Sequence, residues 1–132
     1  MAADFGQLSV LVIDDEPAVR SLVQTMLRRL KVKRTAEAAD AEAGLEQLVA
    51  ADPPFDVVVC DWNMPGLSGI ELWKRVRESN PRLPFLMVTG RADHGSIAEA
   101  VGAGVAAYVV KPFSQKELEA KLAYLSSRLR PS

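Results

Sequence analysis

Residues 8–19, LSVLVIDDEPAV, determine the architecture of the chain. The continuous apolar run Leu8–Ile13 is typical of a strand that is buried on both faces of a sheet. Pro17 is tolerated in the first turn of a helix. The residues behind it are apolar at helical spacing: Val19, Leu22, Val23, Met26, Leu27 and Leu30. The segment therefore predicts a buried strand that leads directly into an amphipathic helix.

The same alternation continues along the rest of the chain. We expect further strands at residues 32–36, 57–60, 85–89 and 105–110, and further helices after Asp40, at 70–78, at 96–103 and after Ser114. Strands and helices that alternate at these lengths require right-handed crossovers and a mostly parallel sheet with helices on both faces.

Two of these helices carry clear start signals. Asp40 is a candidate N-cap for a helix whose apolar face is formed by Leu45, Leu48 and Val49. Ser114 and Glu117 form a capping box at the start of the last helix. The inward face of that helix is expected to consist of Leu118, Leu122, Leu125 and Leu129.

The composition is that of one globular domain. The 132 residues are 48% hydrophobic and 25% charged, with a formal net charge of −1. This balance gives no basic field for nucleic acid or an anionic membrane, and no stretch approaches the ~18 apolar residues of a membrane span. The single cysteine suits a reducing cytoplasm. We expect a cytoplasmic domain at residues 8–129 with short tails at 1–7 and 130–132, and neither a signal peptide nor an effector domain.

Polar side chains stand at the carboxyl ends of four of the five predicted strands. They are Asp14 and Asp15, Asp61, Thr89 and Lys111. Since parallel strands point the same way, these side chains are expected at one edge of the sheet, where open α/β sheets bind ligands. Three carboxylates in one pocket repel each other, so they share either protons or a cation. Oxygen ligands select Mg²⁺ or Mn²⁺ over zinc, and the lysine and threonine can hold a phosphoryl group.

Four motifs in this order resemble the receiver domains of bacterial two-component response regulators. They are Asp14-Asp15, the run DWNMPG at residues 61–66, Thr89-Gly90, and the run YVVKPF at residues 108–113. The resemblance covers about residues 8–129 and is greatest to the stand-alone, CheY-like type. It implies a flavodoxin-like, doubly wound (βα)5 fold, with a five-stranded parallel sheet in the order 2-1-3-4-5 and helices on both faces.

The resemblance also implies a role for each residue of the strand-end set. Asp61 would accept a phosphoryl group, and Thr89 and Lys111 would hold its oxygens. Mg²⁺, for which Mn²⁺ can substitute, would be bound by Asp15, Asp61 and the main-chain oxygen of Asn63, with Asp14 acting through water.

Four further roles follow from the same resemblance. Tyr108 would be an aromatic switch that moves together with Thr89, and the Lys111–Pro112 peptide bond would be cis. Asn63 and Arg91 would tune the reaction rates. Because Arg91 is a cation where related domains frequently carry an acid, we expect it to prolong the phosphorylated state.

The implied function is that of a signalling switch, not of an enzyme with an external substrate. A sensor histidine kinase or a histidine phosphotransfer protein would donate the phosphoryl group. The phosphorylated form would bind a partner through the face formed by residues 96–103, 105–110 and 114–129, and the flagellar motor switch is one candidate. A phosphorelay intermediate or phosphate sink is the alternative. We expect a monomer and leave open a phosphorylation-dependent dimer.

Two other classes share parts of this chemistry. A flavodoxin-type electron carrier has the same type of fold, but Asp14, Asp15 and Glu16 would repel a flavin phosphate from the loop after the first strand. A haloacid-dehalogenase-like phosphatase also uses an aspartyl phosphate and Mg²⁺. Its two acids are separated by one residue, whereas Asp15 follows Asp14 directly. The residues therefore favour the receiver class.

Overall fold

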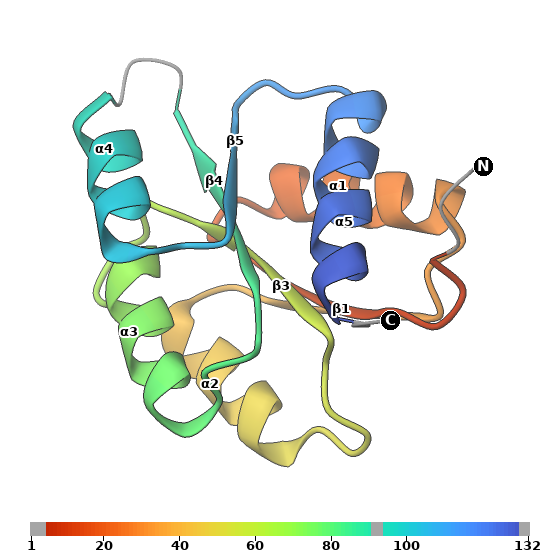
Figure 1. Ribbon diagram of the computed structural model, residues 1–132, viewed down its shortest axis with the longest axis horizontal. Helices are drawn as coiled ribbons and strands as arrows, with labels where there is room; N and C mark the ends of the chain where they lie inside the picture. Colours follow the sequence, from red (N-terminus) through yellow and green to blue (C-terminus); the bar gives the residue numbers. More distant parts are fainter. Residues whose placement is uncertain (1–4, 91–93, 130–132) are drawn as a thin grey trace.

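The computed structural model describes residues 5–90 and 94–129, which form one sheet of five parallel strands with helices around it (Figure 1). The strands are β1 (Ser9–Ile13), β2 (Arg34–Ala38), β3 (Val57–Asp61), β4 (Phe85–Thr89) and β5 (Ala107–Val110). Their order in the sheet is β2-β1-β3-β4-β5, and every neighbouring pair is parallel. The flavodoxin-like, doubly wound fold predicted from the sequence is therefore confirmed.

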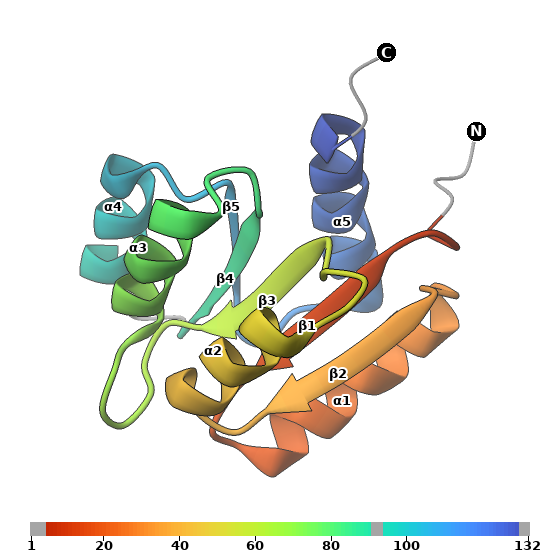
Figure 2. The ribbon, with the colours of Figure 1, turned by 90° about the horizontal axis from the view of Figure 1, so that it is seen from below.

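Five helices cover the two faces of this sheet. They are α1 (Pro17–Arg29), α2 (Ala41–Ala50), α3 (Gly69–Ser79), α4 (His94–Ala103) and α5 (Gln115–Leu129). Helices α1 and α5 lie on one face, and α3 and α4 lie together on the other (Figure 1). Figure 2 shows α2 beside α3 on that second face. None of the helices in the described residues is both long and apolar enough to cross a membrane.

Alternate residues of the buried strands contribute to two separate hydrophobic cores. Val10 and Val12 of β1 pack on the side of α1 and α5, where Leu118, Leu122 and Leu125 are fully buried. Leu11 and Ile13 of β1 pack on the side of α2 and α3. Because the strands are covered on both sides, their sequences are continuously apolar. This burial fixes the register of the sheet and thereby the positions of the strand ends.

The start of β2 differs from the sequence prediction. The strand was expected at residues 32–36, but it begins at Arg34. The main-chain N–H of Val32 donates to the carbonyl of Leu27 in α1, so Val32 still contacts the C-terminal end of that helix. Lys31, with φ of 62°, reverses the chain there. Because of these contacts at the end of α1, β2 begins two residues later than the sequence predicted.

The apolar face predicted for α2 is partly wrong. Leu45 and Leu48 pack against the core as expected, but Val49 is 86% exposed. Helix α2 faces the sheet through Ala41 and Gly44, which are buried, and the close contact of Gly44 with Ile13 sets its rotation. The predicted start signals are confirmed. Asp40 accepts a hydrogen bond from the main-chain N–H of Ala43, and Ser114 and Glu117 exchange the two bonds of a capping box.

Candidate functional site

The polar residues that follow the strands meet at the carboxyl edge of the sheet. Lys111, directly after β5, reaches across this edge past β4 to the ends of β3 and β1. Its Nζ lies 3.4 Å from Oδ2 of Asp14 and 3.4 Å from Oδ1 of Asp61. The same Nζ lies 3.6 Å from Oε1 of Glu16. One ammonium group thus links the end of β3 to the loop between β1 and α1.

Asp14 is the most constrained carboxylate of this group. It is only 2% exposed, and its Oδ1 accepts a hydrogen bond of 2.9 Å from the main-chain N–H of Glu16. Its own N–H donates to the carbonyl of Ala38 at the end of β2. Asp14 is therefore held in place by its main chain and by both carboxylate oxygens, so it orients the loop that carries Asp15 and Glu16.

The charges of the site perturb one another strongly. Burial, followed by repulsion from Asp14, raises the pKa of Asp61 to about 6, although Lys111 acts in the opposite direction. Burial by itself would lower the pKa of Lys111, but the carboxylates of Asp61, Asp14 and Glu16 raise it above its usual value. The lysine is therefore charged at neutral pH, whereas the charged form of Asp61 is disfavoured unless another cation is present.

The loop after β1 has the donor set that a hard cation requires. Carboxylate oxygens of Asp14, Asp15 and Glu16 lie within 4.8 Å of one another, and those of Asp15 and Glu16 face solvent. All the donors are oxygens, which suits Mg²⁺ and leaves positions for water and phosphate. The acids present therefore fit the ion expected from the sequence.

Glu16 is a residue of this site that the strand-end argument did not predict. Glu16 directly follows Asp14 and Asp15 in the sequence. Its distance from the end of β1, however, does not determine the direction in which its side chain points. The structure places its carboxylate at the mouth of the site, 62% exposed and within ion-pair distance of Lys111.

The other predicted residues occupy the same edge or the adjoining surface. Thr89 is 2% exposed, and its Oγ1 has no hydrogen-bond partner among the described residues. Tyr108 of β5 is half-buried, and Asn63 is exposed in the loop after β3. The Lys111–Pro112 peptide bond is cis, as predicted. Arg91 lies outside the described residues.

The start of α3 packs tightly against the carbonyl of Asp61. The N–H of Gly69 donates to the carbonyl of Trp62 at 3.0 Å, and a Cβ added to Gly69 would overlap the main-chain oxygen of Asp61. A glycine is required here because the backbone of α3 approaches the end of β3 too closely for any side chain.

We therefore expect that replacing Gly69 with alanine lowers the free energy of unfolding by about 2 kcal/mol, since the backbone has to move to accommodate the methyl group. Urea denaturation measures the loss. Gly102→Ala in α4 is the matched control, because the added Cβ meets nothing within 4 Å, and it should be neutral or stabilising by up to about 1 kcal/mol. Equal stabilities of the two variants would contradict the close approach.

The sequence matches the response regulator receiver domain family over residues 10–123. It is 43% identical over 124 residues to the chemotaxis protein CheY-3 of Vibrio cholerae, across 92% of this chain and 94% of that protein. It is 41% identical over 124 residues to the chemotaxis protein CheY of Pseudomonas aeruginosa, across 92% and 98% of the two chains.

Solved structures agree with these matches. The chemotaxis protein CheY4 of Vibrio cholerae is similar with a TM-score of 0.81 and 30% identity, over 90% of this chain and 98% of that one. The receiver domain of the Francisella response regulator 1452 is similar with a TM-score of 0.83 and 29% identity, over 94% and 100% of the chains. Sequence, fold and the acidic strand-end pocket lead to one conclusion: the chain belongs to the response regulator receiver domain family, as a CheY-like receiver of two-component signalling.

Proposed function

We propose that this receiver takes a phosphoryl group onto Asp61 in a Mg²⁺-dependent reaction and signals by binding a partner in the phosphorylated form. The observation that carries the proposal is the position of Lys111, whose Nζ lies within 3.4 Å of both Asp14 and Asp61. A half-buried lysine between two carboxylates supplies a charge-assisted donor beside the proposed acceptor. The hydroxyl of Thr89, which is buried and has no hydrogen-bond partner within residues 5–90 and 94–129, provides a second donor for a phosphoryl oxygen.

The proposed Mg²⁺ site uses the acidic loop together with the end of β3. Asp15, Asp61 and the main-chain carbonyl of Asn63 would hold the ion, with Asp14 acting through water. Glu16 adds a further carboxylate at the exposed side. When bound, the ion supplies positive charge that offsets the repulsion between the carboxylates and the incoming phosphoryl group.

In the proposed reaction an oxygen of Asp61 attacks the phosphorus of a phosphohistidine in line with the bond to nitrogen. The new P–O bond forms while the P–N bond breaks, and the imidazole nitrogen keeps the electron pair. Lys111 and Thr89 bind the phosphoryl oxygens during the transfer, so catalysis rests on positioning and electrostatics. Hydrolysis of the acyl phosphate by water later returns Asp61 to its free form.

Labelling with a small phosphodonor tests this proposal. Incubation with acetyl phosphate and Mg²⁺ should add the mass of one phosphoryl group to the intact protein, and excess chelator should prevent the addition. Full labelling in chelator would contradict the metal requirement. Steady turnover of a phosphate monoester would instead favour a phosphatase.

The partners follow from the receiver class. We propose that a sensor histidine kinase or a histidine phosphotransfer protein donates the phosphoryl group. The relatives named as chemotaxis proteins make chemotaxis the leading candidate pathway, with the flagellar motor switch as a candidate target. A phosphorelay intermediate or a phosphate sink is the alternative. Phosphotransfer profiling against the histidine kinases of the host identifies the donor.

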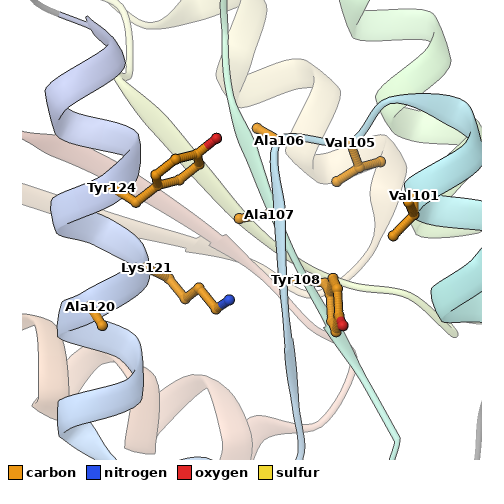
Figure 3. A pocket seen from close by; sticks show the side chains of 8 residues that line it. All are labelled: Val101, Val105, Ala106, Ala107, Tyr108, Ala120, Lys121 and Tyr124. Carbon is orange, nitrogen blue, oxygen red and sulfur yellow. The ribbon is translucent and has the colours of Figure 1, made fainter.

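A groove on the face formed by α4, β5 and α5 is the proposed output surface. Its volume is about 460 Å³, and it is lined by Val101, Val105, Ala106, Ala107, Tyr108, Ala120, Lys121 and Tyr124. Figure 3 shows Lys121 of α5 extending toward Tyr108 of β5, and its Nζ lies 5.5 Å from the centre of the tyrosine ring. Val101 and Tyr124 are exposed large hydrophobic residues at its rim. A movement of Tyr108 would therefore reshape this groove directly.

We expect beryllofluoride, a phosphoryl mimic, to shift amide NMR signals mainly between about Gly90 and Lys121. The reason is that Thr89 pairs with Val110, two residues after Tyr108 on β5, so Thr89 and Tyr108 lie on the same face of the sheet. A threonine hydroxyl drawn to the phosphoryl group thus changes the space beside the tyrosine ring. Asp61→Asn is the control and should show no such shifts. Changes confined to α1 and α2 would contradict this output surface.

A further inference from the structure

Arg20 of α1 connects the acidic loop to the edge strand β2. Its Nη1 donates a 2.8 Å hydrogen bond to the main-chain carbonyl of Asp14, and its Nε donates a 3.0 Å bond to Oε1 of Glu37. The arginine side chain is only 15% exposed. Figure 2 shows α1 lying alongside β2, which is the arrangement that these two bonds require. A planar guanidinium can hold both acceptors in fixed directions at once.

The bond from Arg20 completes the anchoring of Asp14. The N–H of Asp14 donates to Ala38, its Oδ1 accepts from the N–H of Glu16, and its Oδ2 lies beside Lys111. Its carbonyl is the remaining polar group of the residue, and Arg20 provides the donor. The next residue along the chain is Asp15, so the direction of this carbonyl sets the peptide plane that leads to Asp15.

The acceptor of Arg20 on β2 is itself held from two helices. Gln24 of α1 donates to Oε2 of Glu37 at 3.4 Å. Gln47 of α2 donates to the main-chain carbonyl of Glu37 at 2.6 Å. Glu37 therefore gives the guanidinium a fixed point outside the acidic loop.

We infer that Arg20 is a positioning residue for the proposed Mg²⁺ site: through the carbonyl of Asp14 it holds the acidic loop in the geometry that binds the ion. This inference rests on the proposed function, because the ion is the one assigned there. Groups that orient metal ligands without touching the metal commonly change its affinity by 10- to 100-fold. A positive charge near the site acts in the opposite direction, since it repels a cation. If Arg20 positions the loop, its removal should weaken Mg²⁺ binding. If only its charge matters, its removal should strengthen Mg²⁺ binding.

The test is calorimetric titration of the unphosphorylated protein with Mg²⁺ alone. If Arg20 positions the loop, both Arg20→Ala and Arg20→Lys bind Mg²⁺ roughly tenfold more weakly, because a lysine cannot bridge the two acceptors. If Arg20 acts only through its charge, Arg20→Ala binds more tightly and Arg20→Lys is unchanged. Arg28→Ala, an exposed arginine at the other end of α1, is the matched control and should bind like wild type.

A second pair of variants separates geometry from charge at Glu37. Glu37→Gln keeps an oxygen that accepts from Nε of Arg20, so its Mg²⁺ affinity should stay near that of wild type. Glu37→Ala removes that acceptor and should weaken binding several-fold. Both variants lose the same charge, so equal affinities of the two would mean that the Arg20–Glu37 bond does not position the loop, and would contradict the inference. This pair leaves Arg20 in place and so does not depend on the folding of Arg20→Ala.

The kinetics of phosphorylation give an independent readout. In Arg20→Lys, the Mg²⁺ concentration for half-maximal labelling by acetyl phosphate should rise by the same factor as the dissociation constant, with an unchanged plateau rate. Unchanged Mg²⁺ affinity in both Arg20 variants, while wild type binds Mg²⁺, overturns the inference and leaves the proposed function intact. Absence of Mg²⁺ binding by wild type overturns the metal site, and this inference with it.

Discussion

Replacing Asp61 with asparagine should abolish the phosphoryl adduct and also raise the stability of the metal-free protein at pH 7. The first effect follows from the loss of the proposed nucleophilic oxygen. The second follows from burial and repulsion by Asp14, which raise the pKa of Asp61 to about 6. The unfolded carboxyl titrates near its ordinary value of about 3.9. At pH 7 the folded protein must therefore hold a charge that it disfavours, whereas asparagine carries none.

The stability that Asp61→Asn gains over wild type should increase with pH. Between about pH 4 and about pH 6 the folded carboxyl is protonated and the unfolded one is not, so the contribution of Asp61 to the stability of wild type falls as the pH rises through this window. Asp61→Asn lacks this loss, and its advantage should reach on the order of 2 kcal/mol at pH 7 and vanish near pH 4.

Thermal denaturation in chelator from pH 4 to pH 7 measures this difference. Glu46→Gln, which removes an exposed carboxylate of α2, is the control and should show no pH-dependent gain. Saturating Mg²⁺ should stabilise wild type more than Asp61→Asn, because the ion offsets the charge that the variant lacks. A variant with the wild-type melting temperature at pH 7 in chelator would refute the electrostatic account of Asp61.

Replacing Lys111 with alanine should slow phosphorylation by acetyl phosphate about 100- to 1000-fold, which is the typical cost of losing one preorganised donor to a developing charge. The Nζ of Lys111 lies between Asp14 and Asp61 and contacts both carboxylates. Binding of Mg²⁺ should persist or become tighter, because the site loses a positive charge. A slower phosphorylation with retained Mg²⁺ binding would show that Lys111 acts in the transfer step, whereas the carboxylates bind the ion.

The labelling rate at saturating Mg²⁺ and the Mg²⁺ dissociation constant measure these two effects. Lys111→Met keeps most of the apolar stem and should be as slow as Lys111→Ala, which shows that charge rather than packing is lost. Lys116→Ala, an exposed lysine at the start of α5, should retain the wild-type rate. A Lys111→Ala rate within a few-fold of wild type would exclude the lysine from the transfer.

The sequence predicts the parallel sheet, and it predicts that the residues at the strand ends lie close together. Both predictions follow from the parallel arrangement of the strands. Asp14, Asp61 and Lys111 each lie at the end of a strand, so the direction of the strands alone brings them to one edge. The roles assigned to these residues remain predictions that the experiments above test.

The features that the sequence does not predict depend on packing between elements. Glu16 meets Lys111, and Arg20 meets Glu37, through long side chains whose directions are set by neighbours distant in the chain. The exposure of Val49 also depends on packing between elements. Because Gly44 has no side chain, α2 approaches Ile13 closely at that position, and this contact turns Val49 toward solvent. Periodicity identifies which residues share a helix face, but not how that face is rotated against the sheet.

The most direct test of the account is to find which carboxylate carries the phosphoryl group. The protein is labelled with acetyl phosphate and Mg²⁺ and then reduced with borohydride, which converts an aspartyl phosphate to homoserine, and the peptides are mapped by mass spectrometry. We predict homoserine at position 61 alone, beside Lys111 and the buried hydroxyl of Thr89. Homoserine at Asp14, Asp15 or Asp56 would contradict it, as would a labelled protein without homoserine at position 61.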